Sequence, residues 1–363
     1  MDAGLEKIIA AETVLSDVDG AGGRLIIRGV PAQQLAASCT FEEVLHLLWS
    51  GFFDDLPSRE ELAQQLGMAR VRAFARIGPH IEAIAQQPDM QGLRLGLAFV
   101  EDGEALATAI DLLAMAVVVT AAASRFRRGQ SLVAPDAELF HAADFIQMST
   151  AQHPSTAAAH AMNAYLVIVA EHGLNASTFA ARVVASTRAG LASAVIAGVS
   201  ALKGPLHGGA PGPVLDMLDG IGSPEQARGW IDDALARKER LMGFGHRVYK
   251  VRDPRADALK TAIRTLPTSA GRLQLAEAIE QTILQKLKAE KPDLNLQTNV
   301  EFYTAVLLEA LGIPRQDFSC VFASARAAGW IAHAKEQLAS NRMIRPKSVY
   351  VGPAVKPCVL ELA

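Results

Sequence analysis

Cysteine is scarce in this sequence, and the cysteine pairs that bind metals or form redox motifs are missing. Cys39, Cys320 and Cys358 are odd in number, and none belongs to a CxxC pair. The sequence therefore gives no support to a disulfide framework or to a thiolate zinc site. Because thiols stay reduced in the cytoplasm, we expect a cytoplasmic protein.

An excess of charge of either sign is also lacking. The 363 residues include 35 Lys and Arg against 38 Asp and Glu, which gives a net charge of −3. No basic excess points to nucleic acid or to an anionic membrane, so we expect neither as a partner. The N-terminal stretch has acids throughout and no basic start followed by an apolar core, which argues against a secretory signal or an Arg-rich transit peptide.

One hydrophobic run approaches the length of a membrane span. It is "LATAIDLLAMAVVVTAAAS" at residues 106–124, which Asp111 interrupts and in which alanine is frequent. This length is at the lower limit for a span. A helix that is apolar on nearly all sides is typical of the centre of a large helical protein, so we predict a buried helix.

The dominant pattern is that of α-helices, and the clearest helix is predicted at residues 40–51. In "TFEEVLHLLWSG", Thr40 is the expected N-cap, Glu43 follows three residues later, and Gly51 ends the apolar run. The threonine hydroxyl can accept a free backbone N–H and the glutamate can reach back to the cap, which makes a capping box. Similar start and stop signals predict further helices at residues 178–204, 223–243 and 300–314.

Strand signals are sparse. The clearest is "DVDGAGGRLIIRG" at residues 17–29, where a glycine-rich turn precedes an apolar run. Half of the residues are apolar, enough for a substantial core, and the length alone favours two domains. We therefore predict an all-α fold with a possible small N-terminal hairpin.

The signature motifs of several enzyme classes are absent. No HExxH occurs, and no two histidines share a helix face at the short spacing that such a zinc site uses. No GxGxxG follows a strand, and neither a GxxxxGK[ST] phosphate loop nor a GxSxG elbow is present. The sequence thus predicts no metal and gives no motif for a bound cofactor.

Three histidines stand in glycine-containing stretches, where a tight backbone path can fix a ring. His207 lies in "KGPLHGGAPGP", His246 in "MGFGHRVYKVRDPR" and His172 in "AEHGLNAST". The stretch around His246 concentrates positive charge on a mildly acidic protein, which indicates a small anionic ligand. The alternatives are a surface turn for His207, a solvated charged loop for His246 and a helix C-terminus for His172.

Arginines complete this set of candidate residues. They are Arg255, Arg326 and Arg345. A planar guanidinium group binds a carboxylate through two parallel hydrogen bonds, so several arginines that converge would suit a di- or tricarboxylate. Each of them alone is expected to be a surface charge rather than part of a site.

Four motifs, taken together and in order, resemble the citrate synthase family. They are "GPLHGGA", "GFGHRVYKVRDPR", "NVEFY" and "RPKS", and the similarity extends over nearly the whole chain. The resemblance implies a mostly helical homodimer, with a large domain of residues 1–208 and 314–363 and a smaller closing domain of residues 209–313. It also implies condensation of an acyl-CoA substrate with a 2-oxo acid. The usual pair is acetyl-CoA and oxaloacetate, which give citrate and free CoA in the tricarboxylic acid cycle.

The resemblance also assigns roles to individual residues. His207 would hydrogen-bond the thioester oxygen as the enol or enolate develops. His246 would polarise the oxaloacetate carbonyl and supply a proton. His172, Arg255, Arg326 and Arg345 would hold oxaloacetate, with Arg345 reaching in from the partner subunit. The residues near CoA would be Gly243, Phe244, Gly245, Lys250 and Asn299.

One departure from the family pattern concerns the catalytic base. The usual motif is "NVDFY", whereas this sequence has Glu301 in place of the aspartate. A shift of roughly an angstrom in a positioned base can cost about a hundredfold in rate. The open alternatives are a citrate synthase, a 2-methylcitrate synthase that uses propionyl-CoA, and a weakly active or non-catalytic homologue that binds acyl-CoA and a dicarboxylate. A smaller departure is Glu171, where aspartate commonly precedes the histidine.

Overall fold

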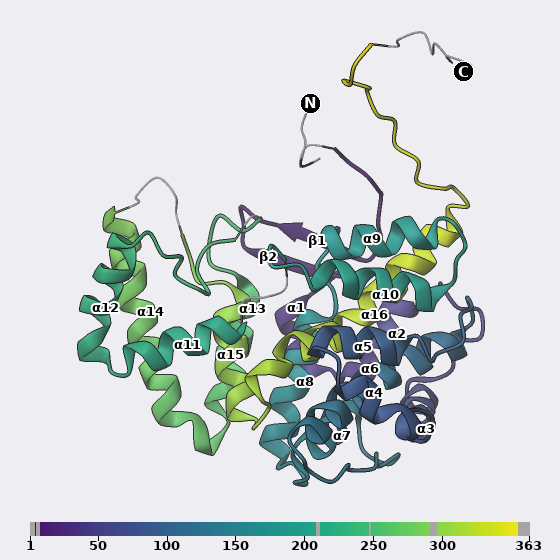
Figure 1. The fold of residues 1–363 in the computed structure, drawn as a ribbon, viewed down its shortest axis with the longest axis horizontal. Helices are drawn as coiled ribbons and strands as arrows, with labels where there is room; N and C mark the ends of the chain where they lie inside the picture. The colour runs from purple at the N-terminus through teal and green to yellow at the C-terminus, as the bar shows by residue number, and fades with distance from the viewer. Residues whose placement is uncertain (1–3, 5–7, 208–210, 247, 291–295, 355–363) are drawn as a thin grey trace, which may run out of the picture.

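The computed structural model describes residue 4 and residues 8–207, 211–246, 248–290 and 296–354. Within these ranges the chain folds mainly into α-helices, with one three-stranded sheet, so the predicted all-α class is confirmed (Figure 1). The elements in chain order are β1 Ser16–Asp19, β2 Arg24–Ile27, β3 Val30–Pro31, α1 Ala32–Ser38, α2 Phe41–Trp49, α3 Arg59–Ile77, η1 Gly78–His80, α4 Ile81–Ala85, α5 Asp89–Leu97, α6 Leu106–Arg127, α7 His141–Thr150, α8 Thr156–Ala170, α9 Ala176–Ala185, α10 Leu191–Leu202, α11 Pro211–Ile221, α12 Pro224–Ala236, α13 Pro254–Arg264, η2 Pro267–Ser269, α14 Ala270–Glu290, α15 Val300–Ala310, η4 Arg315–Asp317 and α16 Phe318–Ala339.

The predicted N-terminal hairpin is confirmed. β1 and β2 pair antiparallel, with Asp19 opposite Arg24. The Asp19 carboxylate accepts the backbone N–H of Gly22 at 2.7 Å, which closes the turn between the strands. Leu25 and Ile27 of β2 are buried in the main core, so the hairpin is fixed to the helices along one face.

Helix α6 is the centre of the larger group of helices. It packs against α3, α4, α5, α7 and α16. It is the one helix in the described residues that is long and apolar enough to cross a membrane, and 83% of its most apolar stretch is buried within the protein. The prediction of a buried helix at residues 106–124 is confirmed.

The predicted capping box is present, because Thr40 accepts from the backbone of Glu43 and Glu43 accepts from the backbone of Thr40. Two predicted helix boundaries were wrong. Residues 178–204 form two helices, α9 and α10, because Arg188 and Gly190 between them adopt φ values of 63° and 99°. The helix predicted at 223–243 ends at Ala236, since φ turns positive at Lys238.

Helices α11, α12, α14 and α15 lie together at one end of the molecule, on the left of Figure 1. α13 packs against α15 on one side and against α8 of the larger group on the other. The two-domain division at residues 209–313 stays a prediction. The packing of α13 places the segment before it, which contains His246, next to the end of α8, which precedes His172.

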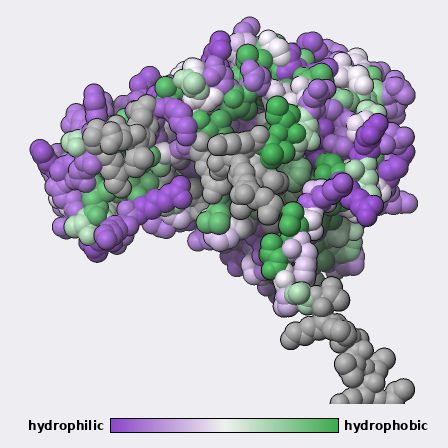
Figure 2. Space-filling view, turned by 90° about the horizontal axis from the view of Figure 1, so that it is seen from above, coloured by the Kyte–Doolittle hydropathy of each residue, from purple (hydrophilic) through white to green (hydrophobic). Residues whose placement is uncertain are grey.

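Residues 341–354, which follow α16, run away from the body of the protein without regular structure (Figure 1). Figure 2 views the molecule from the side on which this tail projects and shows hydrophobic side chains at the base of the tail. Several large apolar side chains of the tail are exposed, and they are Met343, Val349, Tyr350 and Val351.

Candidate active site

The segment that carries His246 is shaped by glycine. Gly243 and Gly245 both have a φ of +84°, a conformation that other residues rarely adopt. A Cβ atom on Gly243 would lie 2.9 Å from Cβ of Phe302, so the backbone here lies directly against α15. This segment is tied to the start of α15, because the backbone N–H of Asn299 donates to Gly243 O at 2.9 Å and its side chain donates to Gly245 O at 2.9 Å.

The ring of His246 has a defined protonation state. Its Nδ1 atom accepts backbone N–H groups from Val248 and Tyr249, both at 3.1 Å, so the ring proton is on Nε2. Burial, reinforced by the charge of Arg255, lowers the pKa of His246 to about 4, which leaves the ring neutral at neutral pH. Nε2 lies 3.4 Å from Nη2 of Arg255. Both groups are then donors, and an acceptor oxygen between them would receive two hydrogen bonds.

His172 lies against His246 from the end of α8. The two rings meet edge to face, with their centroids 5.6 Å apart. His172 Nε2 is 3.1 Å from the hydroxyl of Tyr249, which also stands beside His246. Burial, and then the charge of Arg255, hold the pKa of His172 well below its usual value, so this ring is also neutral. Sequence reasoning missed Tyr249, whose only signal was its place within the motif of His246.

Arg255 is held by Asp253, the N-cap of α13. The two side chains form a bidentate pair, with Nε to Oδ1 at 3.0 Å and Nη2 to Oδ2 at 2.8 Å, and both are almost completely buried. Asp253 also accepts the backbone N–H of Val300 at 3.1 Å. One carboxylate therefore caps α13, neutralises Arg255 and fixes the first turn of α15. Sequence reasoning missed this role, although an aspartate before a proline is a usual N-cap.

Glu301 is the second residue of α15, and its backbone N–H donates to the cap residue Asn299 at 3.0 Å. Its Oε2 atom is buried and has no hydrogen-bond partner. Burial raises the pKa of Glu301 to about 7, against the opposing charges of Arg255 and Arg326. A carboxyl group that titrates near pH 7 is suited to remove and return a proton.

Arg326 of α16 reaches the same region. Its Nε donates to Val169 O at 2.6 Å, whereas its Nη2 is buried without a partner. Burial lowers the pKa of Arg326 to about 10, and the neighbouring charge of Glu171 opposes this shift, so the guanidinium remains charged. Its free donor group is available to an acidic ligand.

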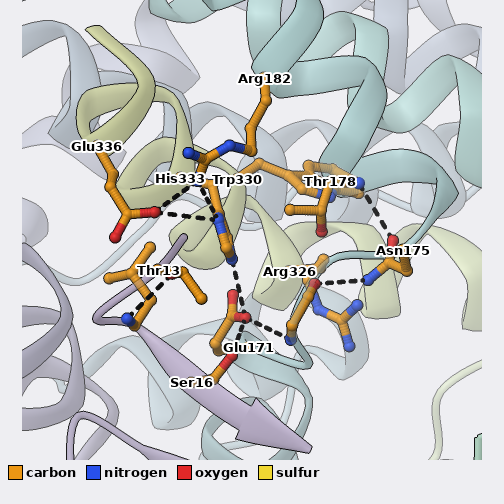
Figure 3. A network of polar contacts seen from close by, with 12 residues as sticks. Thr13, Ser16, Glu171, Asn175, Thr178, Arg182, Arg326, Trp330, His333 and Glu336 are labelled. Atoms are coloured by element: carbon orange, nitrogen blue, oxygen red, sulfur yellow. Dashed lines mark hydrogen bonds and ion pairs between the residues drawn. The ribbon is translucent and has the colours of Figure 1, made fainter. Parts of the chain in front are cut away.

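Glu171 is the centre of a buried polar network (Figure 3). Its Oε1 atom accepts from Ser16 Oγ at 2.8 Å, from the backbone of Gly173 at 2.6 Å and from His333 Nε2 at 3.0 Å. Arg182 donates to Nδ1 of His333 at 2.9 Å, so the proton of His333 is on Nε2 and points at Glu171. The network keeps a carboxylate beside Arg326, and sequence reasoning did not predict it.

The N-terminal segment makes two further contacts, one with this network and one with the segment after His246. The backbone N–H of Val14 donates to Glu336, which also accepts from Arg182. Gly20, in the turn of the hairpin, accepts the backbone N–H of Lys250 at 2.8 Å. The first strands of the fold therefore contact both the residues around Glu171 and the segment after His246.

His207 approaches from the side of α9. Its Nε2 is 2.9 Å from Ser177 Oγ. Ser177 gives its own proton to Oδ1 of Asn175 at 2.8 Å, so His207 is the donor in its bond to Ser177. Trp330 also donates to Ser177. The ring of His207 is thus oriented by α9 and α16, and residues 208–210 of its motif lie outside the described residues.

A cavity of about 350 Å³ opens beside His246. Phe244, Gly245 and His246 line it together with Arg240, a charged residue that sequence reasoning missed. Three of the five residues predicted near CoA, Gly243, Gly245 and Asn299, are linked by hydrogen bonds, and Phe244 lies between two of them. Lys250 is exposed at the edge of this segment.

Arg345 is separate from this cluster, because it lies in the exposed C-terminal tail. The described residues contain no group of three or more His, Cys, Asp or Glu side chains that could hold a metal ion. The structure thus brings His172, His246, Arg255 and Asn299 together directly. Glu301 and Arg326 lie close enough for the charge of Arg255 to lower the pKa of each.

Fold and site together define an enzyme of the all-α class, with neutral histidines and arginines for an acidic substrate and a carboxyl group that titrates near pH 7. A family model described as "Citrate synthase, C-terminal domain" matches residues 4–347. The chain belongs to the citrate synthase family.

Individual relatives agree with this assignment. The chain is 37% identical to a citrate synthase from Haloferax volcanii, over 96% of this chain and 95% of that one. It is also 37% identical to a 2-methylcitrate synthase from Mycobacterium tuberculosis, over 96% and 90% of the two chains. The solved ternary complex of citrate synthase from Thermoplasma acidophilum with carboxymethyl coenzyme A and oxaloacetate is 28% identical, with a TM-score of 0.85 over 98% of this chain and 97% of that one.

The buried pair of Asp253 and Arg255 leads to a stability prediction. Asp253→Asn leaves the Arg255 charge buried without its counter-ion, so we expect the free energy of unfolding to fall by about 3–5 kcal/mol. The matched control is Asp257→Asn, since Asp257 is exposed and pairs with Arg252 at 2.6 Å. That change should cost less than about 1 kcal/mol. Urea unfolding of the three proteins tests the difference, and equal losses would contradict the assigned role of Asp253.

Proposed function

We propose that this protein condenses acetyl-CoA with oxaloacetate to give citrate and free CoA. The observation that carries the proposal is the arrangement around Arg255. His246 Nε2 and Arg255 Nη2 are two donors 3.4 Å apart that cannot bond to each other. A ketone oxygen between them would accept from both, and the carboxylates of a 2-oxo diacid would meet the guanidinium groups of Arg255 and Arg326.

The reaction follows from the protonation states of the side chains. Glu301, as carboxylate, removes a proton from the methyl group of the acetyl thioester. His207, whose Nε2 proton is donated to Ser177 in the free protein, turns this proton to the thioester oxygen and stabilises the enol or enolate. The methyl carbon attacks the ketone carbon of oxaloacetate, and His246 gives its Nε2 proton to the new alkoxide. Water then cleaves the thioester. One proton of the water returns to His246, its hydroxide attacks the thioester carbon, and the proton held by Glu301 leaves with the CoA thiol, so both side chains are restored.

The cavity beside Phe244 and His246 is our candidate for part of the CoA site. It opens next to His246, and its wall includes Arg240, which can donate to a phosphorylated carrier, beside the acidic Glu239. The Thermoplasma relative binds a CoA derivative together with oxaloacetate, which supports a site for both substrates in this chain.

Two alternatives remain for the activity. Propionyl-CoA would give 2-methylcitrate. The Mycobacterium relative is compatible with this reading but does not favour it over citrate. One methylene group changes selectivity only weakly, so pocket shape decides. The second alternative, a weakly active or non-catalytic binding protein, rests on Glu301 in place of aspartate. The raised pKa of Glu301 favours a working base instead.

Thiol release tests the activity. The native protein with oxaloacetate should release CoA from acetyl-CoA faster than from propionyl-CoA, and Glu301→Gln should lower the rate by about 100-fold or more because the base is lost. Faster release from propionyl-CoA would indicate the 2-methylcitrate reaction. Binding of both substrates without release, with turnover gained by Glu301→Asp, would indicate the non-catalytic alternative.

The pH dependence gives a second test. Glu301 acts as a base only when ionised, and its pKa in the free protein is raised to about 7, so kcat/KM for acetyl-CoA should rise as pH increases through about 7. Glu301→Asp should move this inflection, because the carboxyl group on a shorter side chain would differ in burial and in its distance from Arg255 and Arg326, which set its pKa. The same shift makes the free energy of unfolding fall as pH rises from about 4.5 to about 7, because only the unfolded chain ionises in that range, and the loss remains at higher pH. A kcat/KM that stays flat over roughly one pH unit on either side of the inflection would contradict Glu301 as the base.

We extend the proposal to a cytoplasmic homodimer that works in the tricarboxylic acid cycle, with Arg345 entering the site of the partner subunit. Support comes from the exposed apolar side chains at both ends of the chain, which a second copy would cover. They are Ile8, Ile9 and Val14 near the N-terminus and Met343, Val349, Tyr350 and Val351 in the tail. Arg345 lies between these tail residues and is exposed in a single subunit.

A mixed dimer tests the placement of Arg345. Glu301→Gln and Arg345→Ala should each inactivate a homodimer. If Arg345 enters the partner's site, a purified dimer of one chain of each kind holds both lesions in one site and none in the other. It should then have about half of the native turnover. A heterodimer without activity would mean that Arg345 acts within its own subunit.

A further inference from the structure

Tyr165 is a buried polar residue without a role in the mechanism above. It lies on α8 and its side chain is fully buried. Its hydroxyl group has no hydrogen-bond partner. Buried hydroxyl groups are nearly always hydrogen-bonded, because leaving one without a partner opposes folding. An unpaired phenol in the core therefore requires an explanation.

The position of Tyr165 explains why its hydroxyl group has no partner within the protein. α8 packs against α13, α15 and α16, the helices that carry Arg255, Glu301 and Arg326. Arg326 donates to the carbonyl of Val169, which is one helical turn beyond Tyr165 and so on the same side of α8. Burial raises the pKa of Tyr165, as does the charge of Glu301, whereas Arg326 and Arg255 lower it. The phenol therefore faces the groups of the active site.

Three unpartnered polar atoms come together in this region. They are the Tyr165 hydroxyl, Arg326 Nη2 and Glu301 Oε2, each buried and each on a different helix, and the charges of Arg326 and Glu301 both act on Tyr165. A fourth unpartnered atom, Glu171 Oε2, lies beyond the end of α8 near Arg326. Arg326 can only donate, and the phenol, which stays protonated at neutral pH, has a proton to donate. A ligand with acceptor oxygens would satisfy both donors at once, and a carboxylate has such oxygens.

We infer that Tyr165 is a further substrate-binding residue, whose hydroxyl group donates a hydrogen bond to the carboxylate of the 2-oxo acid that Arg326 also holds. The inference rests on the proposed function, because it takes oxaloacetate as the ligand. It explains why a hydroxyl group is kept at a position where phenylalanine would fit an apolar core. The bond forms only with the ligand present, so it contributes to binding and not to the stability of the free protein.

The experiment compares two tyrosines. Tyr165→Phe removes the unpaired hydroxyl, and Tyr303→Phe removes the hydroxyl that donates to Glu280 at 2.6 Å. Oxaloacetate is titrated into each full-length protein by calorimetry, and Tm is measured without ligand. Tyr165→Phe should raise the Kd for oxaloacetate by about 10- to 100-fold, as expected for a lost bond to a charged group, with Tm unchanged or higher. Tyr303→Phe should lower Tm and leave the Kd near the native value.

The possible results separate this inference from the proposed function. If native protein and Tyr165→Phe bind oxaloacetate equally, the role of Tyr165 is wrong and the proposed function stands. An unchanged Kd with a lower kcat would also overturn it, because the hydroxyl would then act on Glu301. If the native protein does not bind oxaloacetate, the proposed function fails and this inference with it.

Discussion

The burial of two arginines in one site is the constraint on which the rest of this structure depends. A guanidinium group removed from water needs a counter-charge with good hydrogen-bond geometry. Asp253 supplies it for Arg255 as a bidentate pair, and Glu171 supplies negative charge near Arg326. The third carboxyl group, Glu301, is buried with them and has no hydrogen-bond partner for Oε2. Burial raises its pKa against the opposing charges of Arg255 and Arg326, so a structural requirement yields a group suited to proton transfer.

The helices and the hairpin meet this constraint through their caps and ends. The carboxylate of Asp253 caps α13 and holds the start of α15, so Arg255 and Glu301 are fixed by the same residue. The carboxylate of Glu171 follows the end of α8 and is held by α16 and β1. Side chains at helix ends are well suited to this purpose, because unpaired backbone groups there fix them in place.

Much of the fold was predictable from local patterns, and part of the site was not. The capping box at Thr40 and the hairpin turn depend on residues close in sequence, so they could be identified directly. The break at Arg188 was missed because a non-glycine residue with positive φ has no composition signal. The motifs located His172, His246 and Arg255. They did not reveal Tyr249, or the bond from His333 to Glu171, since these depend on side-chain directions and on partners far apart in the chain.

The ties between the N-terminal segment and α16 also bear on how the protein is made. Val14 bonds to Glu336 across 322 positions of sequence, and Ser16 bonds to Glu171 across 155. During synthesis the first strands leave the ribosome long before the helix that carries Arg326 and His333 exists. The larger group of helices can begin to pack early, but the polar network closes only when nearly the whole chain is available. A nascent chain that stops before α16 therefore lacks a finished site. In such a chain Val14 has no Glu336 to bond to, and Glu171 has no His333.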